Sequence, residues 1–186
     1  LETVGVERAI GGVIYGGCDA VAPGVVQVEA PQTRLILGHP DDRKSARIEE
    51  LAAALRAEDF IVEGSANIRR DLWAKLQVNI SSGLFACLTD QSLREAYDET
   101  LCQAAVRSLI DEVVALATAL GCTTGFNADR LSGQIRGQQR KTSIALDLEL
   151  HRPIEFDAMF AAPLELARWL GVPTPTFDLL AGLLKL

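Results

Sequence analysis

The chain has 186 residues, of which 48% are hydrophobic, enough to build a packed core in one or two domains. Its formal net charge is -7, and the basic residues are scattered without forming a face or tail, which argues against a nucleic-acid or anionic-membrane partner. Four scattered cysteines with no CxxC pair argue against a zinc site, so we expect no metal. No apolar run reaches the roughly 18–20 residues that cross a bilayer, and we expect a cytoplasmic protein.

The first forty residues carry strand signals. Three short β-branched or apolar stretches are bounded by glycine and proline: "RAIGGVIYGGCDAVAPG", "VVQVEA" and "TRLILG". They predict three strands joined by turns.

A helix and one more strand are expected next. The stretch "DRKSARIEELAAALRAE" spaces its apolar residues at helical intervals, with Asp42 as the predicted N-cap. "DFIVEGS" at 59–65 then predicts a strand. The opening of the chain is therefore expected to run β-β-β-α-β.

From Asn67 onward the strand signal disappears. Helices are predicted at about 68–86, 91–120, 127–150, 155–170 and 175–185. The 91–120 helix has the clearest pattern, with apolar residues at three- and four-residue spacing from Leu93 through Leu101 to Leu120, and Gly121 ends it. This change of pattern predicts a domain boundary near residue 66.

The helix that contains "DLWAKLQVNISSG" at 71–83 is apolar on most of its circumference. Lys75, Asn79 and Ser82 nevertheless fall on one face, at positions i, i+4 and i+7. They can be the solvated edge of an amphipathic helix, or they can line a polar groove in which Lys75 serves as a general acid and anion partner. The pattern alone leaves both interpretations open.

A second polar group lies between residues 140 and 157. Ser143 and Asp147 are one turn apart, and Glu155 falls in the first turn of the next predicted helix. A carboxylate in that position is commonly explained by the helix dipole. His151 is interpreted as a loop residue, because no partner stands at a useful spacing.

Nucleotide-binding motifs are absent from these residues. No GxGxxG opens a strand-turn-helix unit, and no GxxxxGK[ST] occurs. The cofactor-binding residues are therefore unknown from this chain.

Four motifs resemble those of the ketopantoate reductases (2-dehydropantoate 2-reductases). "DLWAKLQVN" resembles the family's "LWxKLxxN", and the segment from Lys141 to Asp157 is similar to its Ser-containing helix followed by an "xEID" turn, here "IEFD". "LGVPTPTFDLL" and "APGVVQ" are similar to its closing "GVPTP" element and its "GPGxV" hairpin.

The resemblance implies an α+β chain that is the C-terminal part of a longer NADPH-dependent enzyme. Residues 1–66 would be the β-rich end of a Rossmann-type nucleotide-binding domain. Residues 67–186 would form an all-α domain, similar to the C-terminal domain of 6-phosphogluconate dehydrogenase, for substrate binding and for a homodimer. The implied reaction is reduction of a 2-oxo acid, ketopantoate, to pantoate in the biosynthesis of pantothenate and coenzyme A.

The resemblance also assigns roles to residues. Lys75 matches the catalytic lysine and Asn79 a substrate-binding asparagine. Ser143 matches the serine that contacts the substrate carboxylate, and Glu155 the glutamate that binds substrate.

One departure keeps alternatives open. The family commonly has an Asn-Pro pair after the conserved asparagine, and this chain has Ser82-Gly83, so a second amide that touches substrate is missing unless Ser82 replaces it. A related reductase of another 2-oxo acid is therefore an alternative. The isolated 186 residues are expected to be inactive and could act only as a helical association module.

Overall fold

The computed structural model describes residues 3, 5–28, 32–130 and 142–186. These residues fold as two compact units, Leu1–Leu72 and Trp73–Leu186. The division falls inside one helix, six residues after the boundary that the sequence pattern predicts at residue 66.

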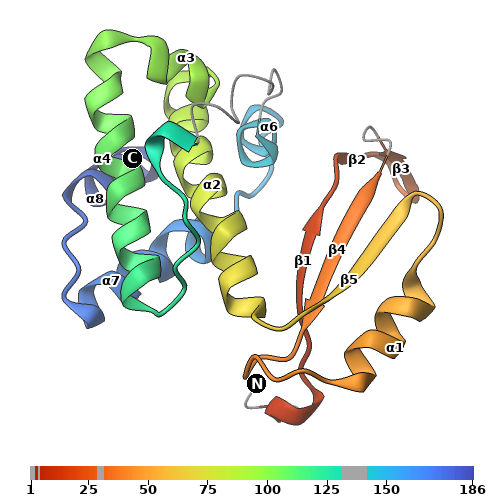
Figure 1. The fold of residues 1–186 in the computed structure, drawn as a ribbon. Coiled ribbons are helices and arrows are strands. Elements are labelled where there is room, and N and C mark those ends of the chain that lie inside the picture. Colours follow the sequence, from red (N-terminus) through yellow and green to blue (C-terminus); the bar gives the residue numbers. More distant parts are fainter. Residues whose placement is uncertain (1–2, 4, 29–31, 131–141) are drawn as a thin grey trace. The chain divides into compact units, whose positions relative to one another are not determined.

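The first unit contains a mixed sheet and a separate hairpin. Its elements are η1 (Val6–Arg8), β1 (Gly11–Tyr15), β2 (Cys18–Ala22), β3 (Val25–Val28), β4 (Thr33–Gly38), α1 (Ala46–Leu55) and β5 (Phe60–Ser65). The sheet has the order β1-β4-β5, with β4 antiparallel to β1 and parallel to β5, and β2 pairs only with β3 (Figure 1). The helix α1 connects the two parallel strands, as such a crossover requires.

The expected element order needs two corrections in this unit. The first predicted strand is divided into β1 and β2, because Gly16 and Gly17 separate two runs of extended backbone. The N-cap of α1 is Ser45 and not Asp42, whose backbone is left-handed with φ 58. The strand predicted at 59–65 is confirmed as β5.

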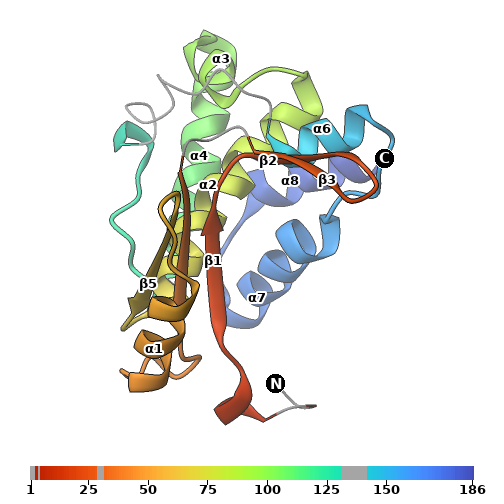
Figure 2. The same ribbon diagram turned by 90° about the vertical axis from the view of Figure 1, so that its right-hand side faces the viewer.

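The second unit is built from helices. Helix α2 (Ile68–Thr89) runs into it from the first unit, and the other described elements are α3 (Leu93–Asp98), α4 (Thr100–Ala119), α6 (Ser143–Glu149), the π-helical turn η2 (Asp157–Ala161), α7 (Ala162–Leu170) and α8 (Pro175–Lys185). Helices α7 and α8 both lie beside α4 (Figure 2). No helix in the described ranges is long and apolar enough to cross a membrane.

Two long helices expected from the sequence are interrupted. The helix predicted at 91–120 breaks at Glu99, which has extended backbone and caps α4 by accepting a hydrogen bond from Leu101 N. Leu101, expected on the apolar face, is 88% exposed as a result. The helix predicted at 127–150 is interrupted at Thr142, the extended N-cap of α6, while its residues 131–141 lie outside the described ranges.

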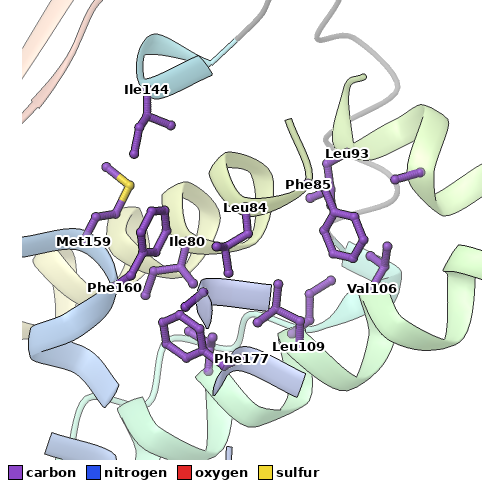
Figure 3. Packing of buried hydrophobic residues seen from close by; sticks show 14 of the residues in the cluster. Ile80, Leu84, Phe85, Leu93, Val106, Leu109, Ile144, Met159, Phe160 and Phe177 are labelled. Carbon is purple, nitrogen blue, oxygen red and sulfur yellow. The ribbon is translucent and has the colours of Figure 1, made fainter. Parts of the chain in front are cut away.

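The main core of the second unit joins α2, α4, η2 and α8. Its fully buried side chains include Ile80 and Leu84 of α2, Leu109 of α4, Phe160 of η2 and Phe177 of α8 (Figure 3). Burying each such side chain contributes about 1.5–3 kcal/mol. This core fixes the face that α2 turns inward and leaves the opposite side of the helix for polar residues.

Contacts within the first unit hold the start of α2. Asn67 Oδ1 accepts a hydrogen bond from Arg70 N at 2.9 Å, and Ser65 donates to the Asp71 carboxylate. Ile68 packs where Gly11 and Gly38 lack side chains; a β-carbon at Gly38 would lie 2.6 Å from Ile68 Cβ. The orientation of the first turn of α2 is therefore set by the end of the sheet.

Candidate functional site

The polar row on α2 is a feature of the folded helix. Lys75, Asn79 and Ser82 follow one another at one-turn spacing within the unbroken helix, and all three are half-buried. They share one face, as the sequence predicts.

The Lys75 ammonium is in an environment that disfavours its charge. Partial burial lowers the pKa of Lys75 below its ordinary value, and the Glu155 carboxylate acts in the opposite direction and raises it. Glu155 is 80 residues away in sequence, yet the fold of the second unit brings it close enough to affect Lys75. A half-buried lysine with a lowered pKa can release a proton more readily than an exposed one.

Ser82 is engaged with its own helix. Its hydroxyl donates to Val78 O at 2.7 Å. A hydroxyl has one proton to donate, so in this geometry Ser82 presents lone pairs to other groups. It offers an acceptor, whereas an amide would offer both an acceptor and donors.

Ser143 is the first residue of α6 and is exposed. The preceding Thr142 forms the N-cap, with Thr142 Oγ1 accepting from Ala145 N at 3.3 Å. The following Ile144 is buried in the main core and lies against α2 near Gly83. The packing of Ile144 therefore determines where the Ser143 backbone lies.

Glu155 follows a tight turn that ends α6. His151 adopts φ 53 in this turn, and Arg152 N donates to Asp147 O at 2.8 Å. Arg152 Nη1 also lies 3.6 Å from Asp147 Oδ1. The exposed Glu155 is thus held between this turn and the π-helical turn η2 that begins two residues later.

The fold brings together most of the predicted site residues. Lys75, Asn79 and Ser82 share a helix face, and Glu155 acts electrostatically on Lys75. Ser143 directly precedes Ile144, whose side chain lies against α2 at Gly83.

The sequence pattern did not identify two inward-facing positions of α2. Gly83 is where α2 meets Ile144, and sequence spacing gives no signal for such a tertiary contact. Gln77 is 0% exposed; its Oε1 accepts from Thr124 Oγ1 at 2.5 Å, and its Nε2 has no hydrogen-bond partner among the described residues. An amide in an apolar stretch resembles a surface residue in the sequence, so its burial could not be foreseen.

Other kinds of chemistry have less support in the described part of the chain. The described residues contain no group of three or more histidine, cysteine, aspartate or glutamate side chains that could hold a metal ion. Burial raises the pKa of the Cys87 thiol to about 11, so this cysteine of α2 is protonated at neutral pH and is a poor nucleophile.

Comparisons with known proteins bear on the family and the fold of this chain. The family described as "Ketopantoate reductase PanE/ApbA C terminal" matches residues 67–186. A 2-dehydropantoate 2-reductase of Mesorhizobium japonicum is 31% identical over 185 residues, which are 99% of this chain and 56% of that protein. The chain thus spans little more than half of that relative's length.

Solved structures show the same fold. A 2-dehydropantoate 2-reductase of Geobacter metallireducens superposes with a TM-score of 0.87 at 30% identity, covering 99% of this chain and 62% of the other. A D-mandelate dehydrogenase in a ternary structure with NADH and anilino(oxo)acetate has a TM-score of 0.84 at 20% identity, covering 99% of this chain and 61% of the other, a likeness of fold alone. The chain belongs to the ketopantoate reductase family, and its residues 67–186 correspond to that family's C-terminal domain.

Proposed function

We propose that this chain is the C-terminal part of an NADPH-dependent reductase that converts ketopantoate to pantoate. The observation that carries the proposal is the half-buried Lys75, whose pKa is lowered by burial and raised again by Glu155. The family relationship supports the substrate, since the Mesorhizobium relative is named a 2-dehydropantoate 2-reductase.

The chemistry of the site residues fits such a reduction. The nicotinamide would supply a hydride to the C2 carbonyl, which becomes an alkoxide that requires a proton. Lys75 stabilises this developing charge and donates the proton, and a half-buried ammonium is stronger in this role than one in bulk water.

The remaining residues act on substrate position. Asn79 orients the substrate from the next turn of α2, and Ser82 supplies an acceptor one turn further. Ser143 binds the substrate carboxylate, and Glu155 accepts a hydrogen bond from the substrate hydroxyl while it sustains the charge on Lys75. We assign no residue of this chain to the cofactor, and NADPH over NADH rests on the family resemblance.

The first test replaces the lysine in the full-length enzyme. Lys75→Ala is expected to reduce kcat for ketopantoate by about two to four orders of magnitude, because general-acid catalysis is lost. Folding is expected to survive, because the substitution also removes a partly desolvated charge. Lys44→Ala, at an exposed position in the first unit, is the matched control and should retain full turnover. Near-normal kcat in Lys75→Ala would contradict the assignment.

A related enzyme with another 2-oxo acid is the second candidate. The observation that favours it is the Ser82-Gly83 pair, where the Ser82 hydroxyl proton is already donated to Val78 O. Initial rates on ketopantoate and on smaller 2-oxo acids, measured with NADPH and with NADH, would separate the two. Higher kcat/KM for a smaller acid would replace the proposed substrate and leave Lys75 in its role.

The proposal extends to the isolated chain. We expect no turnover from the 186 residues alone, and a homodimer through the helical unit. Size-exclusion chromatography distinguishes a monomer of 20.0 kDa from a dimer of about twice that mass. Turnover by the isolated chain would contradict the expectation that these 186 residues are inactive by themselves.

A further inference from the structure

Gly83 occupies an unfavourable place for a glycine. It is buried in the interior of α2, where glycine stabilises a helix less than alanine does. Its surroundings explain why a larger residue is absent: a β-carbon would lie 3.0 Å from Ile144 Cγ2, 3.6 Å from Phe160 Cζ and 3.7 Å from Met159 Sδ. The contact with Ile144 is tighter than ordinary van der Waals packing.

These neighbours belong to the two segments that carry the remaining site residues. Ile144 directly follows Ser143 in α6, and Met159 and Phe160 lie in η2, shortly after Glu155. Figure 3 shows Ile144, Met159 and Phe160 gathered beside α2. Helix α6 and the turn η2, which are neighbours in sequence but distant from α2, therefore meet α2 at its one position without a side chain.

We infer that Gly83 is a positioning residue, which sets the spacing between the Lys75–Asn79–Ser82 face of α2 and Ser143 on α6. This inference rests on the proposed function, because it is the binding of the substrate carboxylate by Ser143 that gives the spacing its importance. A methyl group at residue 83 moves Ile144 outward by a few tenths of an ångström, and Ser143 moves with it. Asn79 and Lys75 stay in place, since they lie one and two turns earlier on α2, respectively.

A change at Gly83 should affect substrate binding and leave proton transfer nearly unchanged. In the full-length enzyme, Gly83→Ala is expected to raise KM for the 2-oxo acid about tenfold and to change kcat by less than about threefold. The matched control is Gly182→Ala in α8, another helical glycine, around which a β-carbon would meet no atom within 4 Å. Its KM should equal that of the unmodified enzyme.

A second substitution tests the route through Ile144. Ile144→Ala removes Cγ2, so the double variant Gly83→Ala/Ile144→Ala has room for the added methyl group. Its KM is expected to agree within about twofold with that of Ile144→Ala alone, which rescues the spacing effect. If Gly83→Ala does not fold, the comparison of the double variant with Ile144→Ala still tests whether Gly83 acts through Ile144.

The results that overturn the inference are distinct from those that overturn the proposed function. An unchanged KM in Gly83→Ala, or a tenfold difference that persists in the Ile144→Ala background, refutes the positioning role. Absence of turnover in the unmodified enzyme refutes the proposed function instead. In that case amide hydrogen exchange tests the contact between α2 and α6 without turnover. Gly83→Ala should alter exchange at residues 142–146, and Gly182→Ala should not. Equal exchange in the two variants would refute the positioning role of Gly83.

Discussion

Glu112 of α4 stabilises the start of α8 from a different helix. Its Oε1 accepts from Thr176 N at 2.9 Å, and its Oε2 accepts from Phe177 N at 2.8 Å. Pro175 has no N–H, and Asp178 N donates to Thr174 O, so Glu112 accepts from both remaining donors of the first turn. The Thr174 side chain does not cap the helix, so the Glu112 carboxylate takes the role of an N-cap.

Removing that carboxylate should cost measurable stability. Phe177 is 0% exposed, so its N–H loses a charged acceptor where water has little access. We expect Glu112→Ala to lower the free energy of unfolding by about 2–3 kcal/mol, which corresponds to a decrease in Tm of about 5–10 °C. Glu112→Gln keeps one acceptor oxygen and should lose about half as much.

Urea denaturation followed by tryptophan fluorescence measures this effect in the relevant unit. Both tryptophans lie in the second unit: Trp73 is 8% exposed and reports its unfolding, whereas Trp169 is 75% exposed and changes little. Asp111→Ala, at the exposed neighbouring position, controls for the loss of a negative charge. A Glu112→Ala free energy within about 0.5 kcal/mol of that control, at an equal m-value, would refute the capping argument.

Two further predictions concern the segment around Glu155. Because the Glu155 carboxylate raises the pKa of Lys75, Glu155→Gln should lower that pKa. In the full-length variant, the fall of kcat with rising pH should therefore begin at a lower pH than in the unmodified enzyme. An unchanged pH profile would show that the two groups are not coupled. His151 holds φ 53, which glycine adopts without steric cost, so His151→Gly should raise the free energy of unfolding by about 0.5–1 kcal/mol. Urea denaturation tests this second change, and a loss of stability would mean that the imidazole itself supports the turn.

Helix faces could be predicted from the sequence where one helix runs without interruption. The predicted helix 175–185 coincides with α8, and the row from Lys75 to Ser82 lies within α2 as expected. In both cases the 3.6-residue period applies from end to end. The periodicity failed at Glu99, where a carboxylate caps a new helix and turns Leu101 outward, because a capping group can break a helix without any glycine or proline.

The relation between the site residues could not be predicted from spacing. Glu155 affects Lys75 through a tertiary arrangement of α2 and η2, and no periodic pattern joins residues so far apart. Ser143 is placed by the packing of its neighbour Ile144 against Gly83, which depends on atoms of three segments. The motif resemblance indicated these residues, and the physical reason for their proximity became visible only in the fold.

The π-helical turn at Asp157–Ala161 has a consequence for comparing members of the family. A π turn holds one residue more than an α turn, so a relative that lacks this residue can keep an unchanged α7 core. Because the wider turn accommodates the extra residue locally, the same relative can also keep the residue that corresponds to Glu155 in its place before the helix. An alignment gap within these five positions is therefore compatible with an unchanged arrangement of the residues on both sides of the turn.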